Sequence, residues 1–307
     1  MAVATQTLPP LLGHGEDEYV RERHLTWKKF TRHRLALAGA AVLLLMILAA
    51  VFAPLLTRFN PNDIDAVWSG SPLAPGIHGH SLGTDEIGRD LLSRLMFGAR
   101  ISLVVAFVAV IVEVTVGTFI GAVAGYFGGW IDWVLMRITD VFLSIPLLPL
   151  LLVITGIIIN VSDKASLSFV WICIIIGLLS WPTAARLVRA AFLSLREKEF
   201  AEAARAVGGG SARIILRHLL PNAMAPIIVQ ATLDIANIII LESVLSYLGF
   251  GIQPPTASWG SMLANAQENA QIAWWAAVFP GLCIFVTVLA INYMGDGLRD
   301  ALDPNVS

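Results

Sequence analysis

The sequence has few cysteines, few lysines and little charge. Cys173 and Cys283 are its two cysteines, and both lie in apolar runs, so neither a disulfide framework nor a metal site is indicated. We interpret them as small hydrophobic side chains. None of the four lysines follows a glycine, which excludes the phosphate-binding loop of an ATPase. The H-E-x-x-H pattern of a metalloprotease is also absent, and a net charge of −2 argues against nucleic acid as a partner.

The sequence is instead rich in long apolar runs. Hydrophobic residues make up 57% of the chain and the mean hydropathy is +0.76, values typical of an integral membrane protein. We expect an all-α fold with six membrane-spanning helices, because each of six runs can cross the roughly 30 Å hydrocarbon layer. They lie at about 35–56, 101–125, 135–159, 167–184, 223–247 and 274–294.

The distribution of lysine and arginine predicts the orientation. With the N-terminus inside, 15 of the 20 basic residues lie on the cytoplasmic side and 5 outside, as the positive-inside rule requires. The polar tail 1–34 and the C-terminus are then cytoplasmic. The first run is longer than a signal-peptide core, so we favour a retained anchor over cleavage near AAVFA.

The first external loop, about 57–100, ends in a candidate short helix. Leu91, Leu92, Leu95 and Met96 recur at helical spacing, which fits either a helix on the outer membrane surface or a soluble helix packed on the loop. His78 and His80 are too few for a metal site, so we expect a flexible loop there.

Glycines and prolines inside the runs predict local features. Gly117, Gly121 and Gly125 form a small-xxx-small pattern, which fits close packing within the bundle or a subunit interface. Pro146 and Pro149 predict a kink in the third span. Pro182 is expected to interrupt the end of the fourth span.

The segment 185–222 cannot enter the lipid. It carries seven basic and three acidic side chains, whose insertion would cost about 25 to 35 kcal/mol. Its pattern predicts a short amphipathic helix that Gly208 ends with a left-handed cap. We expect Ser211 to cap a second helix that Pro221 closes. Exposed small apolar residues beside charges favour docking on another protein over docking on the chain's own bundle.

This segment resembles the EAA loop of the membrane subunits of binding-protein-dependent ABC importers. The resemblance rests on Glu202-Ala203-Ala204, then Gly208, then Leu220-Pro221; it departs at His218, where the pattern is usually apolar. It implies a hairpin, 199–221, that seats in the ATPase subunit and passes its movement to the bundle. The coupling residues it implies are Phe200, Glu202, Ala203, Ala204, Val207, Gly208, Arg213, Leu220 and Pro221.

More of the chain is similar to one branch, the C-type permease subunits of the dipeptide, oligopeptide and nickel importers. The similar stretches include LGTDEIGRDLLSRLMFGARISL, GYFGGWIDWVLMRITDVFLSIP, SYLGFGIQPPTASWGSML and FPGLCIFVTVLAINYMGDGLRDALDP, within about 80–304. The resemblance implies a type I importer permease fold: tail 1–34, first helix 35–56, external loop 57–100, and a five-helix core 101–304 that contains coupling loop 185–222.

The same resemblance implies the chain's partners and location. They are a second permease subunit, two cytosolic ATPases that hold the ATP and Mg²⁺, and an external substrate-binding protein, all at a bacterial-type inner membrane. No cofactor is expected on this chain. Peptides are the default cargo, with glutathione and nickel left open.

Acidic side chains inside the spans mark a candidate substrate path. Glu113, Asp140, Asp234 and Glu242 are costly in lipid unless they face water, the bundle interior or a partner. A local pair with Arg137 is one explanation for Asp140. For the fifth span we favour a hydrated, substrate-facing role over interhelical hydrogen bonding. The candidate path residues are Asp140, Ser144, Asp234, Asn237, Glu242, Ser243 and Ser246.

Two other classes of function remain as alternatives at this point. A channel or an ion-coupled secondary transporter would use the intramembrane acids as proton sites. An intramembrane enzyme would need two carboxylates that face each other across spans, which spacing alone does not establish.

Overall fold

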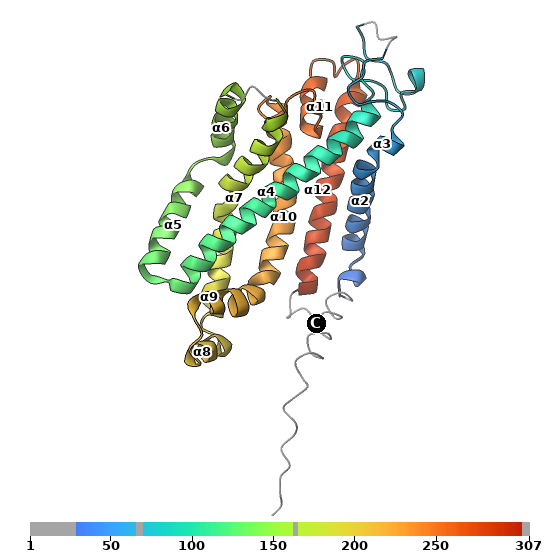
Figure 1. The fold of residues 1–307 in the computed structure, drawn as a ribbon. Helices are drawn as coiled ribbons and strands as arrows, with labels where there is room; N and C mark the ends of the chain where they lie inside the picture. Colours follow the sequence, from blue (N-terminus) through green and yellow to red (C-terminus); the bar gives the residue numbers. More distant parts are fainter. Residues whose placement is uncertain (1–28, 66–69, 162–164, 303–307) are drawn as a thin grey trace, which may run out of the picture.

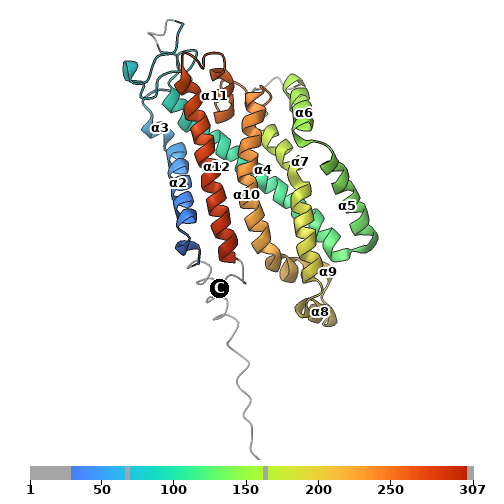
Figure 2. The ribbon, with the colours of Figure 1, turned by 180° about the vertical axis from the view of Figure 1, so that it is seen from behind.

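The computed structural model describes residues 29–65, 70–161 and 165–302, and the side chains of these residues except at 160–168. Most of the tail 1–34 therefore lies outside the described residues. The described part is helical, and its long helices run side by side from one end of the molecule to the other (Figures 1 and 2). We call the two ends the hairpin end, which carries 196–219, and the loop end, which carries 57–90 and 248–273.

Five of the described helices are long and apolar enough to cross a membrane, and α5 and α6 together would make a sixth. The long helices are α2 (Arg34–Val51), α4 (Leu91–Phe127), α7 (Ala165–Leu195), α10 (Leu220–Tyr247) and α12 (Trp274–Leu302). The shorter elements are α3 (Ala53–Leu56), η1 (Ile77–Gly79), α5 (Gly129–Ser144), α6 (Leu147–Val161), α8 (Glu199–Ala206), α9 (Ser211–Ile214), η2 (Ile215–Leu219) and α11 (Trp259–Ala266).

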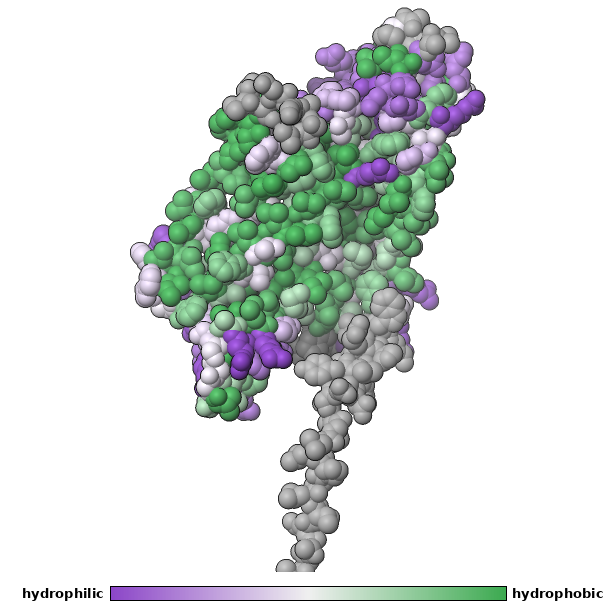
Figure 3. Space-filling model, viewed as in Figure 1, coloured by the Kyte–Doolittle hydropathy of each residue, from purple (hydrophilic) through white to green (hydrophobic). Residues whose placement is uncertain are grey.

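Hydropathy is distributed along the long axis as a bilayer requires. Figure 3 shows a hydrophobic belt around the middle of the visible face, with hydrophilic side chains gathered at the loop end and beside the hairpin. Many large apolar side chains are exposed on this belt, such as Leu45, Phe107 and Phe119. In lipid such exposure is favourable rather than costly.

The separate short helix expected at Leu91–Met96 does not exist. These residues form the first turns of α4, which runs without a break for 37 residues. The carboxylate of Asp90 caps it by accepting from the Ser93 amide at 2.8 Å, and nothing breaks the helix before Gly128, which has φ 65°. Leu91 and Leu95 are buried against α11 and α12, so the loop-end part of α4 is neither a surface helix in lipid nor an independent one.

The three glycines of α4 pack within the bundle, which decides between the two expectations for them. A Cβ on Gly117 would lie 2.6 Å from Ala184 Cβ, and one on Gly125 would lie 2.6 Å from Phe192 Cβ. Both partners belong to α7. Because glycine lacks a Cβ, the two backbones approach closely along this seam, and α4 with α7 forms the most extensive helix pair.

The expected third span is two helices. α5 and α6 meet at an angle of 83°, and the break falls at Ile145 and Pro146, where the missing amide and fixed φ of proline disfavour a continuous helix. The expected kink is thus confirmed, and it divides the span into two helices that together cover 129–161 rather than 135–159. Pro149 lies in the first turn of α6, where a proline costs no internal hydrogen bond.

Two other prolines do not end helices as expected. α7 continues through Pro182 to Leu195, so the segment after it starts about ten residues later than 185. Pro221 lies in the first turn of α10, and residues 211–247 are continuously helical. The π-type turn 215–219 precedes Pro221; a wider turn relieves the clash of a proline ring with the preceding turn.

Candidate functional site

The hairpin begins with α8 and a glycine cap. Gly208 has φ 79°, its amide donates to Arg205 O at 2.9 Å, and the Gly209 amide donates to Ala204 O at 3.0 Å. These two bonds form a Schellman cap, which confirms the expected left-handed end of the first helix. Ser211 does not cap the second helix: Gly210 occupies the N-cap position, with no side-chain cap bond.

One face of the hairpin is anchored to the bundle. Ala201 is fully buried with Phe192, Ile214 and Leu219. The Arg205 guanidinium donates to Arg196 O at 2.9 Å, and the guanidinium of Arg196 in turn donates to Gly125 O at 3.1 Å. The hairpin is therefore fixed to α7 and to the end of α4.

The other face of the hairpin is open. Ala203 is exposed beside Glu199 and Glu202, Phe200 is 38% exposed and Val207 is 86% exposed. On the second helix Leu216 is exposed and His218 is half-buried. An apolar patch between acidic side chains, carried on a rigid anchored helix, is a surface suited to a protein partner.

A second candidate site is a cavity of about 440 Å³ inside the bundle. It lies between α4, α7 and α10 and the bend from α5 to α6. Its polar lining residues are Glu113, Ser180, Thr183, Asp234 and Asn237, and its apolar ones include Phe142, Ile145, Leu147, Leu179, Ile238 and Leu241. Two of the seven candidate path residues, Asp234 and Asn237, therefore line it, together with Glu113.

The remaining candidate path residues lie elsewhere. Asp140 is within 4.0 Å of Arg137, as expected for a local pair, but Arg186 of α7 approaches it more closely. It lines a groove nearer the hairpin end. Ser144 is exposed, and its hydroxyl donates to Val141 O at 2.7 Å.

Glu242, Ser243 and Ser246 lie outside the cavity lining. Glu242 and Ser246 belong to a polar cluster, whereas the buried hydroxyl of Ser243 has no hydrogen-bond partner among the described residues. Glu242 is fully buried; it accepts from Ser246 Oγ at 2.7 Å and from Ser102 Oγ at 3.4 Å. Ser258, which caps α11, reaches the same cluster through Ser246 Oγ at 3.3 Å. Side chains of α4, α10 and α11 thus meet at one buried carboxylate, so interhelical hydrogen bonding describes this part of α10.

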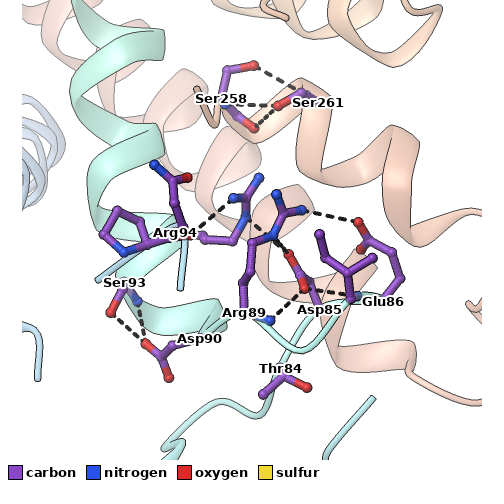
Figure 4. A network of polar contacts seen from close by, with 12 residues as sticks. Thr84, Asp85, Glu86, Arg89, Asp90, Ser93, Arg94, Ser258 and Ser261 are labelled. Carbon is purple, nitrogen blue, oxygen red and sulfur yellow. Dashed lines mark hydrogen bonds and ion pairs between the residues drawn. The ribbon is translucent and has the colours of Figure 1, made fainter. Parts of the chain in front are cut away.

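Ion pairs link the described residues of the loop end. In Figure 4, Arg89 and Arg94 converge on the carboxylate of Asp85; their Nε atoms lie 2.6 Å and 3.2 Å from Asp85 Oδ2. His80 is buried, with its ring nitrogens 2.7 Å from Asp65 Oδ2 and from Asp90 Oδ1, whereas His78 is exposed. Among the described residues no group of three or more His, Cys, Asp or Glu could hold a metal ion.

Two loop-end groups have shifted pKa values. Burial by itself lowers the pKa of His80, but hydrogen bonds to Asp90 and Asp65 and their negative charges outweigh it and raise the pKa. Burial raises the pKa of Glu86, and the charge of Asp85 adds to the rise. Residues 79–83, GHSLG, match G-x-S-x-G in sequence, but Ser81 is exposed in a turn, outside the strand-to-helix context of a nucleophile elbow.

Several contacts in these sites were not foreseeable from sequence spacing. Asp132 of α5 forms an ion pair with Arg189 of α7, 57 residues away. His80 gains its two aspartates from positions 10 and 15 residues away. The one available signal for Glu113 is its charge within an apolar run.

Comparison with known proteins establishes the family. Residues 117–307, more than half of the chain, match the family described as binding-protein-dependent transport system inner membrane component. The chain belongs to this family. Residues 23–75 also match the N-terminal TM domain of oligopeptide transport permease C, in agreement with the C-type branch.

Two peptide-transport permeases align over nearly the whole chain. The dipeptide transport system permease protein DppC of Alkalihalophilus pseudofirmus is 41% identical over 293 residues, which cover 95% of this chain and 93% of the relative. The di/tripeptide transport system permease protein DppC of Pseudomonas aeruginosa is 39% identical over 283 residues, 91% of each chain.

Two solved ABC transporters share the fold. The MetNI methionine ABC transporter in inward facing conformations gives a TM-score of 0.51 at 21% identity, over 69% of this chain and 96% of its own. An amino acid ABC transporter with histidines gives 0.50 at 20% identity, over 68% and 92%. The predicted importer permease fold is thereby confirmed.

The family settles the chain's general role. It is a non-catalytic, multi-pass component of an inner-membrane importer, with ATP hydrolysis on separate chains. Such a component works with ATPase subunits and a substrate-binding protein. The family supports ATP-driven import over a channel or secondary transporter.

Proposed function

We propose that this chain is one half of the membrane path of a peptide importer and that its hairpin, 199–221, docks into a cytosolic ATPase. The observation that carries the docking is the open face of α8, formed by Phe200, Ala203 and Val207. It is presented on a helix whose opposite face is anchored. Movement of a docked ATPase would reach α7 through Arg196 and Arg205, and α10 through the continuous helix from residue 211.

The rest of the coupling set supports this docking in different ways. Glu202 places a negative charge beside the apolar patch. Ala204 is half-buried between α8 and the bundle, and Gly208 forms the turn that ends α8. Arg213 is exposed on the second helix. Leu220 and Pro221 join that helix to α10.

Di- or tripeptide cargo is favoured by the relatives, because both named DppC proteins are 39 to 41% identical over nearly the whole chain. A second, homologous permease subunit completes the path. The hairpin and the C-terminus face the cytosol, where the partner ATPases bind ATP and Mg²⁺. The excess of basic residues at the hairpin end supports this orientation. We assign Asp234 and Asn237 to the path, and Asp140, Ser144, Glu242, Ser243 and Ser246 to the helices that support it.

The docking is tested by placing a large charge on the open face. Ala203→Arg inserts a guanidinium at the centre of the patch, where an unpaired charge is costly to bury. We expect at least about a tenfold loss of ATPase co-purification, which corresponds to about 1.4 kcal/mol. The matched control is Ala270→Arg, the same change at an exposed position of the loop end. Equal recovery of the ATPase with both variants would exclude the hairpin as the docking site.

A further inference from the structure

We propose that the cavity beside the α5–α6 bend binds the protonated amino group of the cargo, with Glu113 and Asp234 as its counter-charge. This inference rests on the proposed peptide cargo for the identity of the ligand. It states what the cavity would recognise: an ammonium group with an apolar group next to it.

The first support is an unbalanced charge. Glu113 is 3% exposed and Asp234 is 7% exposed, both line the cavity, and their carboxyl groups lie within hydrogen-bonding reach of each other. No described Lys, Arg or His lies within 4.0 Å of either one; the nearby Arg186 and Arg189 pair with the aspartates of α5. The carboxyl pair therefore has no described basic partner to balance its charge.

The two carboxyl groups differ in their partners. Asp234 accepts from the Gln230 amide at 2.9 and 3.1 Å and from the Asn237 amide at 3.5 Å. Among the described residues Glu113 has no such donor, so its remaining acceptor capacity faces the cavity. A carboxylate left this way in the membrane interior is expensive unless a cation or water approaches it. An ammonium group supplies three donors and the opposite charge in one compact unit.

The second support is the shape and lining of the cavity. Its volume of about 440 Å³ falls within the roughly 300 to 1,000 Å³ typical of small-molecule sites. The rest of the lining is mostly an apolar wall that includes Phe142, Ile145 and Leu147. A metal ion would gain nothing from that wall and would need more oxygen ligands than two carboxylates offer. The free amino terminus of a peptide could contact the carboxyl groups while an apolar side chain next to it contacts the apolar lining.

The test is direct binding to the assembled transporter in nanodiscs, without the substrate-binding protein. The probes are alanyl-phenylalanine and its N-acetyl derivative, which differ in the charge of the amino group. Wild type should bind the free-amine dipeptide at least about tenfold more tightly. Glu113→Gln and Asp234→Asn should each reduce this preference, because each removes one of the two ionisable groups while keeping the side chain's shape.

Asp296→Asn is the matched control, since Asp296 is an exposed carboxylate of a spanning helix outside the cavity, and it should retain the preference. Equal affinity for both probes in wild type, or an unchanged preference in the two cavity variants, would overturn the proposal and leave the acids as a structural pair. ATPase association, measured on the same preparations, reports the proposed function separately. ATPase association that Ala203→Arg leaves unchanged would refute hairpin docking without affecting the selectivity comparison.

Discussion

At the scale of single residues, glycine determines how closely α4 and α7 approach. The seam at Gly117, Gly121 and Gly125 has no room for a Cβ, since the nearest α7 atoms already occupy that space. Helices in lipid gain little from the hydrophobic effect and depend on such close contact. These three positions therefore hold α4, which carries Glu113, against α7, which leads into the hairpin.

Gly125→Ala should lower the stability of the folded chain. The added methyl would lie 2.6 Å from Phe192 Cβ and 2.8 Å from Arg189 O, and overpacking of this kind costs about 1 to 3 kcal/mol. Gly281→Ala is the control, because the nearest atom to its Cβ is 3.9 Å away and alanine favours helix over glycine. The apparent melting temperature in detergent should fall for Gly125→Ala only. An equal decrease for both variants would contradict the claim that the contact between α4 and α7 at Gly125 has no room for a methyl group.

His80 should make the stability of the loop end depend on pH. Its folded pKa is raised by Asp65 and Asp90 above the usual value near 6.5. Its contribution is therefore fully present below the unfolded pKa and is lost as the pH rises through the folded pKa. The difference in melting temperature between wild type and His80→Gln should be largest at about pH 6 and smaller at about pH 9. A difference that grows with pH would contradict this assignment.

At the scale of elements, the hairpin depends on one turn. Gly208 adopts a left-handed conformation that reverses the chain between α8 and α9. Two hydrogen bonds from its own amide and the next close the turn. The direction of α8, and hence of its open face, follows from this cap.

Gly208→Ala should weaken ATPase association. Alanine at φ 79° is strained by about 1 kcal/mol, and relief of that strain would turn α8 away from its docked direction. Gly210→Ala is a close control: it lies two residues away, also in open space, but with φ −65°. Titration of the purified permease with the ATPase should show a weaker affinity for Gly208→Ala and little change for Gly210→Ala. The reverse order would exclude a role for the cap.

The sequence predicted the apolar spans better than their ends, for a physical reason. Hydropathy locates lipid-facing segments, but a helix continues wherever its hydrogen bonds can, as α4 does to Asp90 and α7 does through Pro182. The proposed coupling residues of α8 were recognisable because α8 is a local motif. Glu113 facing Asp234 was not, since it depends on the way two helices pack.

At the scale of the whole molecule, the two ends of the bundle have different chemistry. The loop end is held by the buried charges around Asp85 (Figure 4) and around His80. The hairpin end carries the open face of α8. Between them lies the cavity beside the α5–α6 bend, at the one broken helix pair among the described residues. This arrangement would allow a partner bound at the hairpin end to alter the cavity in the middle of the bundle.

The orientation predicts which end a membrane-impermeant thiol reagent reaches. With the permease expressed without its ATPase, a cysteine at Ala203 should react in inside-out vesicles, and a cysteine at Ala270 should react in intact spheroplasts; both positions are exposed. Cys173 is buried and Cys283 lies within α12, so a variant with both replaced by alanine provides the background. Labelling of Ala203→Cys from the outside would invert the topology.

The most direct measurement of the central claim is photo-crosslinking from residue 203 in native membranes. A benzophenone amino acid at this position should give an adduct with an ATP-hydrolysing subunit, and the same probe at residue 270 should not. With the probe at position 207 instead of 203, the chain that carries Gly208→Ala should give less ATPase adduct than the chain with Gly208. An assembled transporter in which residue 203 crosslinks to no ATPase, or in which residue 270 does so instead, would contradict the account.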